Sequence, residues 1–131
     1  MRAKAIIFLY LLVGLINFIP ILGVTGRAKL EALYGASFSS ADLLLLMQHR
    51  ALLLGIVGAF LLVAAFHPAF RPMAAIAGMA SMVGFDVLYL IVPGVSGRLA
   101  GVATIDAVAV VLLAVAIGLD YRRVRNAIDN H

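Results

Sequence analysis

The sequence contains no cysteine and no tryptophan among its 131 residues, and only 12% of its residues are charged. The absence of cysteine excludes disulfides, thiolate zinc sites, iron–sulfur clusters and thiol chemistry. Soluble domains carry about 25% charged residues and about 45–50% apolar ones, whereas this chain is 65% hydrophobic. A chain of this length exposes too large a share of its surface to hide so much apolar area from water. We therefore expect it to fold in a lipid bilayer.

Four apolar stretches are long enough for membrane-spanning helices, each of which needs about 20 residues. They extend approximately over residues 5–24, 43–66, 73–92 and 99–119, and short connections join the last three. Residues 1–131 are therefore predicted to form a single all-α domain, an antiparallel four-helix bundle that is integral to the membrane.

The longer connection between the first two spans has helical features of its own. Within "RAKLEALY", Leu30, Leu33 and Tyr34 recur at helical spacing, so we expect a short helix that lies in the membrane interface of the first outer loop. Ser39 is followed three residues later by Asp42, a pattern that resembles a capping box. Ser39 is therefore expected to cap the second span.

The basic residues predict the orientation, because cytoplasmic loops carry an excess of Lys and Arg. With both termini in the cytoplasm, the inner side holds Arg2, Lys4, Arg71, Arg122, Arg123 and Arg125. The outer side then holds Arg27, Lys29 and Arg98. Six basic residues inside against three outside favour this orientation. In a bacterium the membrane would be the cytoplasmic (inner) membrane. Since these residues sit at segment ends, the net charge of +4 does not indicate nucleic-acid binding.

Every span also carries a polar residue at a similar depth. These residues are Asn17, His49 and Arg50, Asp86, and Asp106. At about 1.5 Å per residue, all of them lie roughly 8–12 Å below the outer membrane boundary. Ionisable groups inside a membrane usually mark functional sites. We therefore expect these five residues to line a ligand site in the outer half of the bundle.

Asp86 is expected to pair with Arg50. Side chains lean toward the N-terminus of their own helix, so Asp86, on an ascending helix, leans deeper into the membrane and has to be paired or protonated. A separate expectation concerns the directions in which Arg50 and its two neighbours point. Gln48, His49 and Arg50 fan over about 200° of a helix, so one of them faces a neighbouring helix or a second protein.

A purely structural network is the alternative interpretation of this polar layer. Polar contacts between membrane helices contribute only about 0.6 kcal/mol on average and up to about 2 kcal/mol. Inserting each charged side chain costs about 2.5–3.5 kcal/mol on insertion scales. This balance favours a functional pocket.

A short motif recurs at the outer ends of the first and third spans, as "GVTGR" before residue 28 and "GVSGR" before residue 99. Glycines followed by a hydroxyl and an arginine can form a backbone nest for an anion, such as a lipid phosphate. Because the motif is short, a helix-ending turn with an interfacial anchor is the favoured explanation. In either case Arg27 and Arg98 are expected at the lipid headgroups.

No cofactor or metal is expected. His49 and His67 lie eighteen residues apart on one helix, which is about 27 Å by helical rise, so they cannot hold one haem between them. The sequence contains no zinc-type cluster, nucleophile elbow or phosphate-binding loop.

Three segments carry a family resemblance: "KLEALYG" (29–35), "MQHRALLLGIVGAFLLVAAF" (47–66) and "HPAFRPMA" (67–74). With them, nearly the whole chain resembles a group of small bacterial integral membrane proteins of four spans and unknown function. Some of these carry the name phosphopantetheine adenylyltransferase. That soluble enzyme is similar to other nucleotidyltransferases in needing an α/β fold and an H-x-G-H-type motif, and this chain has neither. The resemblance therefore implies the architecture and no catalytic residue.

The functional expectation is a non-enzymatic membrane protein whose outer polar layer binds a small amphipathic or anionic ligand, a lipid among them, or a partner helix. One alternative is a membrane-embedded enzyme acting on a lipid or quinone, with His49 as general base and Asp86 or Asp106 orienting it. Another is a proton-coupled transporter, which with four spans would need a homodimer. Beyond the bilayer and such a ligand, the expected partner is a second copy or a larger membrane complex.

Overall fold

The computed structural model describes residues 2–95 and 97–129, with the side chains of Arg98 and of residues 127–129 outside the description. Its four long helices are α1 (Arg2–Phe18), α3 (Ala41–Phe66), α4 (Arg71–Ile91) and α5 (Ala100–Asp129). A short helix, α2 (Arg27–Tyr34), and three 3₁₀ segments, η1 (Ile19–Thr25), η2 (Pro68–Phe70) and η3 (Gly97–Leu99), connect them. The described residues form no strand, so the predicted all-α fold is confirmed.

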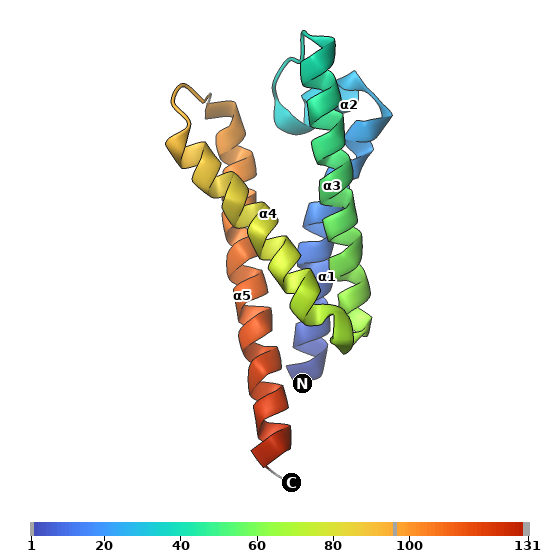
Figure 1. Cartoon of the computed structure of the whole chain (residues 1–131), viewed down its shortest axis with the longest axis vertical. Coiled ribbons are helices and arrows are strands. Elements are labelled where there is room, and N and C mark those ends of the chain that lie inside the picture. The colour runs from blue at the N-terminus through green and yellow to red at the C-terminus, as the bar shows by residue number, and fades with distance from the viewer. Residues whose placement is uncertain (1, 96, 130–131) are drawn as a thin grey trace.

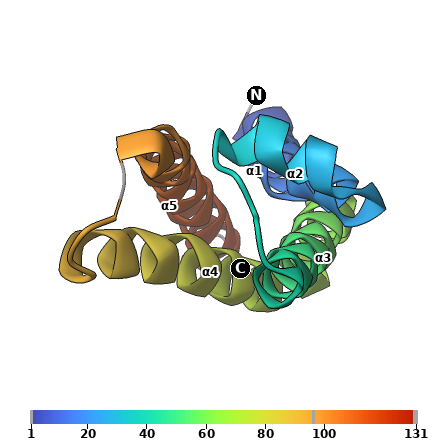
Figure 2. The same ribbon diagram turned by 90° about the horizontal axis from the view of Figure 1, so that it is seen from above.

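The four long helices form an antiparallel bundle. In it α1 packs against α3 and α5, and α4 also packs against α3 and α5. Figure 1 shows α1 beginning and α5 ending at the lower end, whereas α2 lies at the upper end. Seen from above in Figure 2, α4 crosses from α3 to α5, and α2 lies over the end of the first span. The α4–α5 pair and the α1–α3 pair separate toward this upper end (Figures 1 and 2).

All four predicted spans correspond to helices that are long and apolar enough to cross a membrane, over residues 2–25, 41–66, 68–91 and 100–126. The first span ends in the 3₁₀ segment η1, because Pro20 lacks the N–H that an α-helix needs there. The fourth span is longer than expected, since the polar residues after Leu119 continue the helix.

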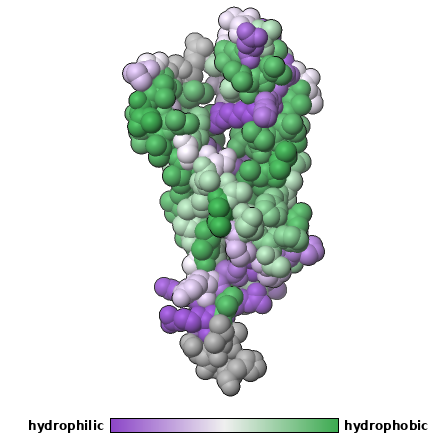
Figure 3. All heavy atoms as spheres, in the orientation of Figure 1, coloured by the Kyte–Doolittle hydropathy of each residue, from purple (hydrophilic) through white to green (hydrophobic). Residues whose placement is uncertain are grey.

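The exposed surface of the bundle is mostly apolar. Large side chains such as Leu46, Ile76 and Leu90 are 66–80% exposed on helices from different parts of the chain. Figure 3 shows hydrophobic residues over most of the visible face, with hydrophilic ones at the lower end and in a notch near the upper end. A soluble protein would not leave so much apolar surface in contact with water. The fold therefore belongs in a membrane.

The short helix α2 is present as expected, and it packs inward. Leu30 and Tyr34 are buried against the bundle together with Phe38 and Ala51, and only Leu33 of the predicted apolar face is exposed. The helix ends at Tyr34, and Gly35, with a left-handed backbone (φ 61°), follows it and donates its N–H to the Glu31 carbonyl.

The cap of α3 differs from the prediction. Ser40, and not Ser39, accepts a hydrogen bond from the Leu43 N–H at 3.1 Å. A capping residue has extended backbone and directly precedes the first helical residue. Ser40 meets both conditions, with φ −92° and ψ 149° before Ala41. Sequence spacing alone did not distinguish the two adjacent serines.

At the lower end the structure buries a charge that the sequence analysis placed in a loop. The Arg71 side chain is 3% exposed, and its Nη1 lies 2.7 Å from Oδ1 of Asp120. Its Nε and Nη2 donate to the carbonyls of Ala64 and Ala65, at 3.2 and 3.1 Å. These carbonyls belong to the last turn of α3, which has no helical partners for them. Arg71 therefore closes α3 and ties it to α5.

Close helix contact between α1 and α3 depends on Gly58. A Cβ atom on Gly58 would lie 2.5 Å from the backbone nitrogen of Phe18 and 2.7 Å from the carbonyl oxygen of Gly14. Both neighbours are backbone atoms, so they cannot move aside as a side chain would. Small residues at such positions allow membrane helices to approach closely.

We predict that Gly58→Ala separates α1 from α3 and lowers the free energy of unfolding by about 1–3 kcal/mol, the usual cost of overpacking. Thermal unfolding in detergent, followed by circular dichroism, measures the change. Gly118→Ala is the matched control, because a Cβ at Gly118 meets no atom within 4 Å. Equal unfolding temperatures for the two variants would contradict the proposed contact.

Candidate functional site

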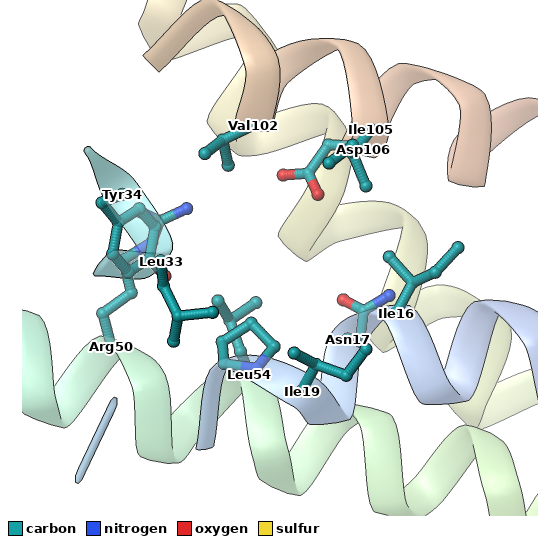
Figure 4. Close-up of a pocket in the computed structure, with 11 residues that line it drawn as sticks. Ile16, Asn17, Ile19, Leu33, Tyr34, Arg50, Leu54, Val102, Ile105 and Asp106 are labelled. Carbon is teal, nitrogen blue, oxygen red and sulfur yellow. The ribbon is translucent and has the colours of Figure 1, made fainter. Parts of the chain in front are cut away.

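The upper half of the bundle contains a cavity of about 250 Å³ between α1, α2, α3 and α5. Apolar side chains form most of its wall, and Asn17, Tyr34, Arg50 and Asp106 are its polar residues. Figure 4 shows Arg50 and Tyr34 at one end of the cavity, with the Asp106 carboxylate and the Asn17 amide toward the other end. Its other lining residues are Ile16, Ile19, Pro20, Leu33, Leu54, Val102 and Ile105.

Three of the five residues expected in the polar layer line this cavity: Asn17, Arg50 and Asp106. They come from α1, α3 and α5, which are far apart in the sequence. The constant rise of a helix brings them to one level of the bundle, and the packing of α1 against α3 and α5 turns them toward the same cavity.

Asn17 is 3% exposed and is fixed by its own hydrogen bonds. Its amide nitrogen donates to the Val13 carbonyl at 3.0 Å, one helical turn earlier, and to the sulfur of Met82 at 3.4 Å. The second bond links α1 to α4. Because both amide hydrogens are engaged, Asn17 has only its carbonyl oxygen left for a molecule in the cavity.

Arg50 is held by aromatic rings. Its guanidinium carbon lies 4.3 Å from the centre of the Phe85 ring and 5.3 Å from that of Tyr34. Both distances are within the range of cation–π attraction, which is stronger away from water. No described carboxylate lies within 4.0 Å of the guanidinium, so Arg50 forms no ion pair with Asp86 or Asp106.

Tyr34 is a cavity residue that the sequence analysis assigned only to the apolar face of α2. Its side chain is 4% exposed, and its hydroxyl is buried without a hydrogen-bond partner among the described residues. Burial raises the pKa of Tyr34 above its ordinary value; the charge of Arg50 opposes this and that of Asp106 adds to it. The phenol therefore stays protonated at neutral pH and can donate a hydrogen bond.

Asp86 does not pair with Arg50, contrary to the expectation. It lines a separate groove of about 430 Å³ between α4 and α5, together with Tyr89 and Thr104. Adjacent residues on a helix point about 100° apart, so the residue of α4 that faces Arg50 is Phe85. One carboxylate oxygen of Asp86 is buried and has no partner among the described residues.

The three polar residues 48–50 point in different directions, as their angular spread around the helix requires. Arg50 faces the cavity, and Gln48 donates to the Val24 carbonyl at 3.2 Å, which holds the end of η1 against α3. His49 is exposed and is not among the residues that line the cavity. A general base at His49 oriented by Asp86 or Asp106 therefore finds no geometric support.

Arg27, one of the two arginines expected at headgroups, bonds to a loop of the protein itself. Arg27 is exposed, and its guanidinium donates to the Phe38 carbonyl, while the Glu31 carboxylate accepts from the Phe38 N–H at 3.1 Å. Arg27 and Glu31 therefore fix the loop between α2 and α3. The side chain of Arg98 lies outside the described part of the chain.

No protein-family model, curated protein or solved structure matches this chain. Across the described residues, no group of three or more His, Asp or Glu side chains is placed to hold a metal ion. The chemistry of the cavity is therefore set by its apolar walls and by its hydrogen-bonding groups, which are the guanidinium of Arg50, the phenol of Tyr34, the Asn17 carbonyl and the carboxylate of Asp106.

Proposed function

We propose that the protein binds a small amphipathic molecule in the cavity between α1, α2, α3 and α5. The observation that carries this proposal is the buried hydroxyl of Tyr34, which has no hydrogen-bond partner among the described residues, beside the half-buried charges of Arg50 and Asp106. Buried polar groups that lack hydrogen bonds cost several kcal/mol away from water. A ligand that satisfies them would recover this cost.

The surroundings of the cavity support an amphipathic ligand. Ile19, Leu33 and Ile105 line it and are also 39–54% exposed on the outer surface of the bundle. The cavity therefore borders the surface that faces lipid. Its volume of about 250 Å³ lies below the usual range for sites that enclose a whole drug-sized ligand, about 300–1,000 Å³. It suits the polar end of a molecule whose apolar part stays in the bilayer.

Filling the cavity should remove the ligand. We predict that Leu54→Phe, at a lining position of α3, strongly reduces the amount of small amphipathic molecules that copurify with the protein in lipid nanodiscs. Extraction followed by mass spectrometry gives that amount. The neighbouring substitution Leu53→Phe is the matched control, because Leu53 is 51% exposed and does not line the cavity. If Leu54→Phe and Leu53→Phe retain the same bound molecules as the unmodified protein, the cavity is not the binding site.

We also propose that the membrane is the cytoplasmic membrane of a bacterium, with both termini in the cytoplasm. The six-to-three distribution of basic residues and the resemblance to small bacterial four-span proteins support this placement. It puts α2 and the cavity in the outer half of the bilayer.

The absence of cysteine makes this orientation testable. Ser39→Cys, in the exposed loop before α3, should react with a membrane-impermeant maleimide in intact spheroplasts. Ala69→Cys, in the exposed segment η2, should react only after lysis. The opposite labelling pattern would reverse the orientation.

A further inference from the structure

The cavity holds side chains of both charge signs, and they are not paired with each other. Arg50 and Asp106 line the same space, and no carboxylate oxygen of the described side chains lies within 4.0 Å of the guanidinium. Opposite charges that share a site poorly exposed to water attract each other strongly and normally form an ion pair. Their separation therefore calls for a physical cause in the surrounding structure.

The cause is the packing around Arg50. Phe85 of α4 and Tyr34 of α2 hold the guanidinium from two helices, at 4.3 and 5.3 Å from their ring centres. Asp106 enters from α5, and Figure 4 shows it away from the Arg50 end. The backbone positions of these helices, together with the two rings, keep the charges apart. The cavity thus contains two opposite charges that the surrounding structure holds apart.

A single charge uses only part of this arrangement. An anion near Arg50 would be attracted by the guanidinium and partly repelled by the more distant Asp106 carboxylate, and a cation near Asp106 would be attracted by the carboxylate and partly repelled by the guanidinium. A molecule with both charges, separated along its length, would be attracted at both ends. The phenol of Tyr34 adds a hydrogen-bond donor beside the guanidinium, where an anionic oxygen would accept it.

Building on the proposed amphiphile site, we infer that the ligand is zwitterionic, with its ammonium against Asp106 and its phosphate or carboxylate against Arg50 and Tyr34. The exposed apolar side chains of Ile19 and Ile105 beside the cavity favour a lipid headgroup, such as phosphatidylethanolamine, over a free molecule of the same chemistry.

The test compares two lipids of matched acyl chains. The protein is placed in nanodiscs of equal phosphatidylethanolamine and phosphatidylglycerol, then released into detergent, and the retained lipid is measured by native mass spectrometry. We expect phosphatidylethanolamine to be enriched roughly tenfold, which corresponds to about 1.4 kcal/mol. Asp106→Asn should abolish the preference while some lipid is still retained. Asp42→Asn, which removes an exposed carboxylate that does not line the cavity, should keep it.

A competition experiment distinguishes the two sources of the ligand. Soluble O-phosphoethanolamine that displaces the retained lipid would support a zwitterion that enters as a free molecule, and failure to displace it would support the lipid headgroup. Equal retention of both lipids by the unmodified protein would overturn the inference, and this result needs no variant to fold. The proposed function would survive if Leu54→Phe still removed the lipid, and it would fail separately if Leu54→Phe had no effect.

Discussion

The guanidinium of Arg50, packed against the rings of Phe85 and Tyr34, is the interaction on which the cavity depends. It connects α3 to α4 and to α2, and it keeps a positive charge at one end of a space whose walls are mostly apolar. Without these two rings the flexible side chain could extend toward Asp106 and neutralise it. The aromatic contacts therefore preserve both the charge separation and the open space between the charges.

The two ends of the bundle surround their arginines differently: Arg71 is buried at one end, and Arg50 is half-buried at the other. At the lower end, Arg71 is fully engaged: each of its three guanidinium nitrogens has a partner, and one of these is the carboxylate of Asp120. At the upper end, Arg50 packs against two rings, and no carboxylate in the described part of the chain lies within ion-pair distance of it. The same fold can therefore supply a buried charge with partners from its own carbonyls and carboxylates. Every guanidinium nitrogen of Arg71 has a partner, whereas Arg50 has no such partners among the described residues. This difference supports the binding of a ligand at the upper end.

The four spans, and the gathering of Asn17, Arg50 and Asp106 at one level of the bundle, could be predicted because they depend on apolar run length and helical rise. The direction of each side chain could not, since small rotations of a helix about its axis are set by packing. Thus Phe85, and not Asp86, faces Arg50, while His49 is exposed beside it. The burial of Arg71 also escaped prediction, because its partners in α3 and α5 meet only in the folded bundle. The helical spacing of Tyr34 placed it on the apolar face of the short helix. The position of its hydroxyl, however, depends on how α2 packs against the bundle.

The most direct measurement of the central claim is an experimental structure of the protein in nanodiscs that contain phosphatidylethanolamine, at a resolution that shows side chains. We expect non-protein density between Arg50 and Asp106, in contact with the hydroxyl of Tyr34. A direct ion pair between Arg50 and Asp106, with the cavity closed around it, would contradict the proposed binding site.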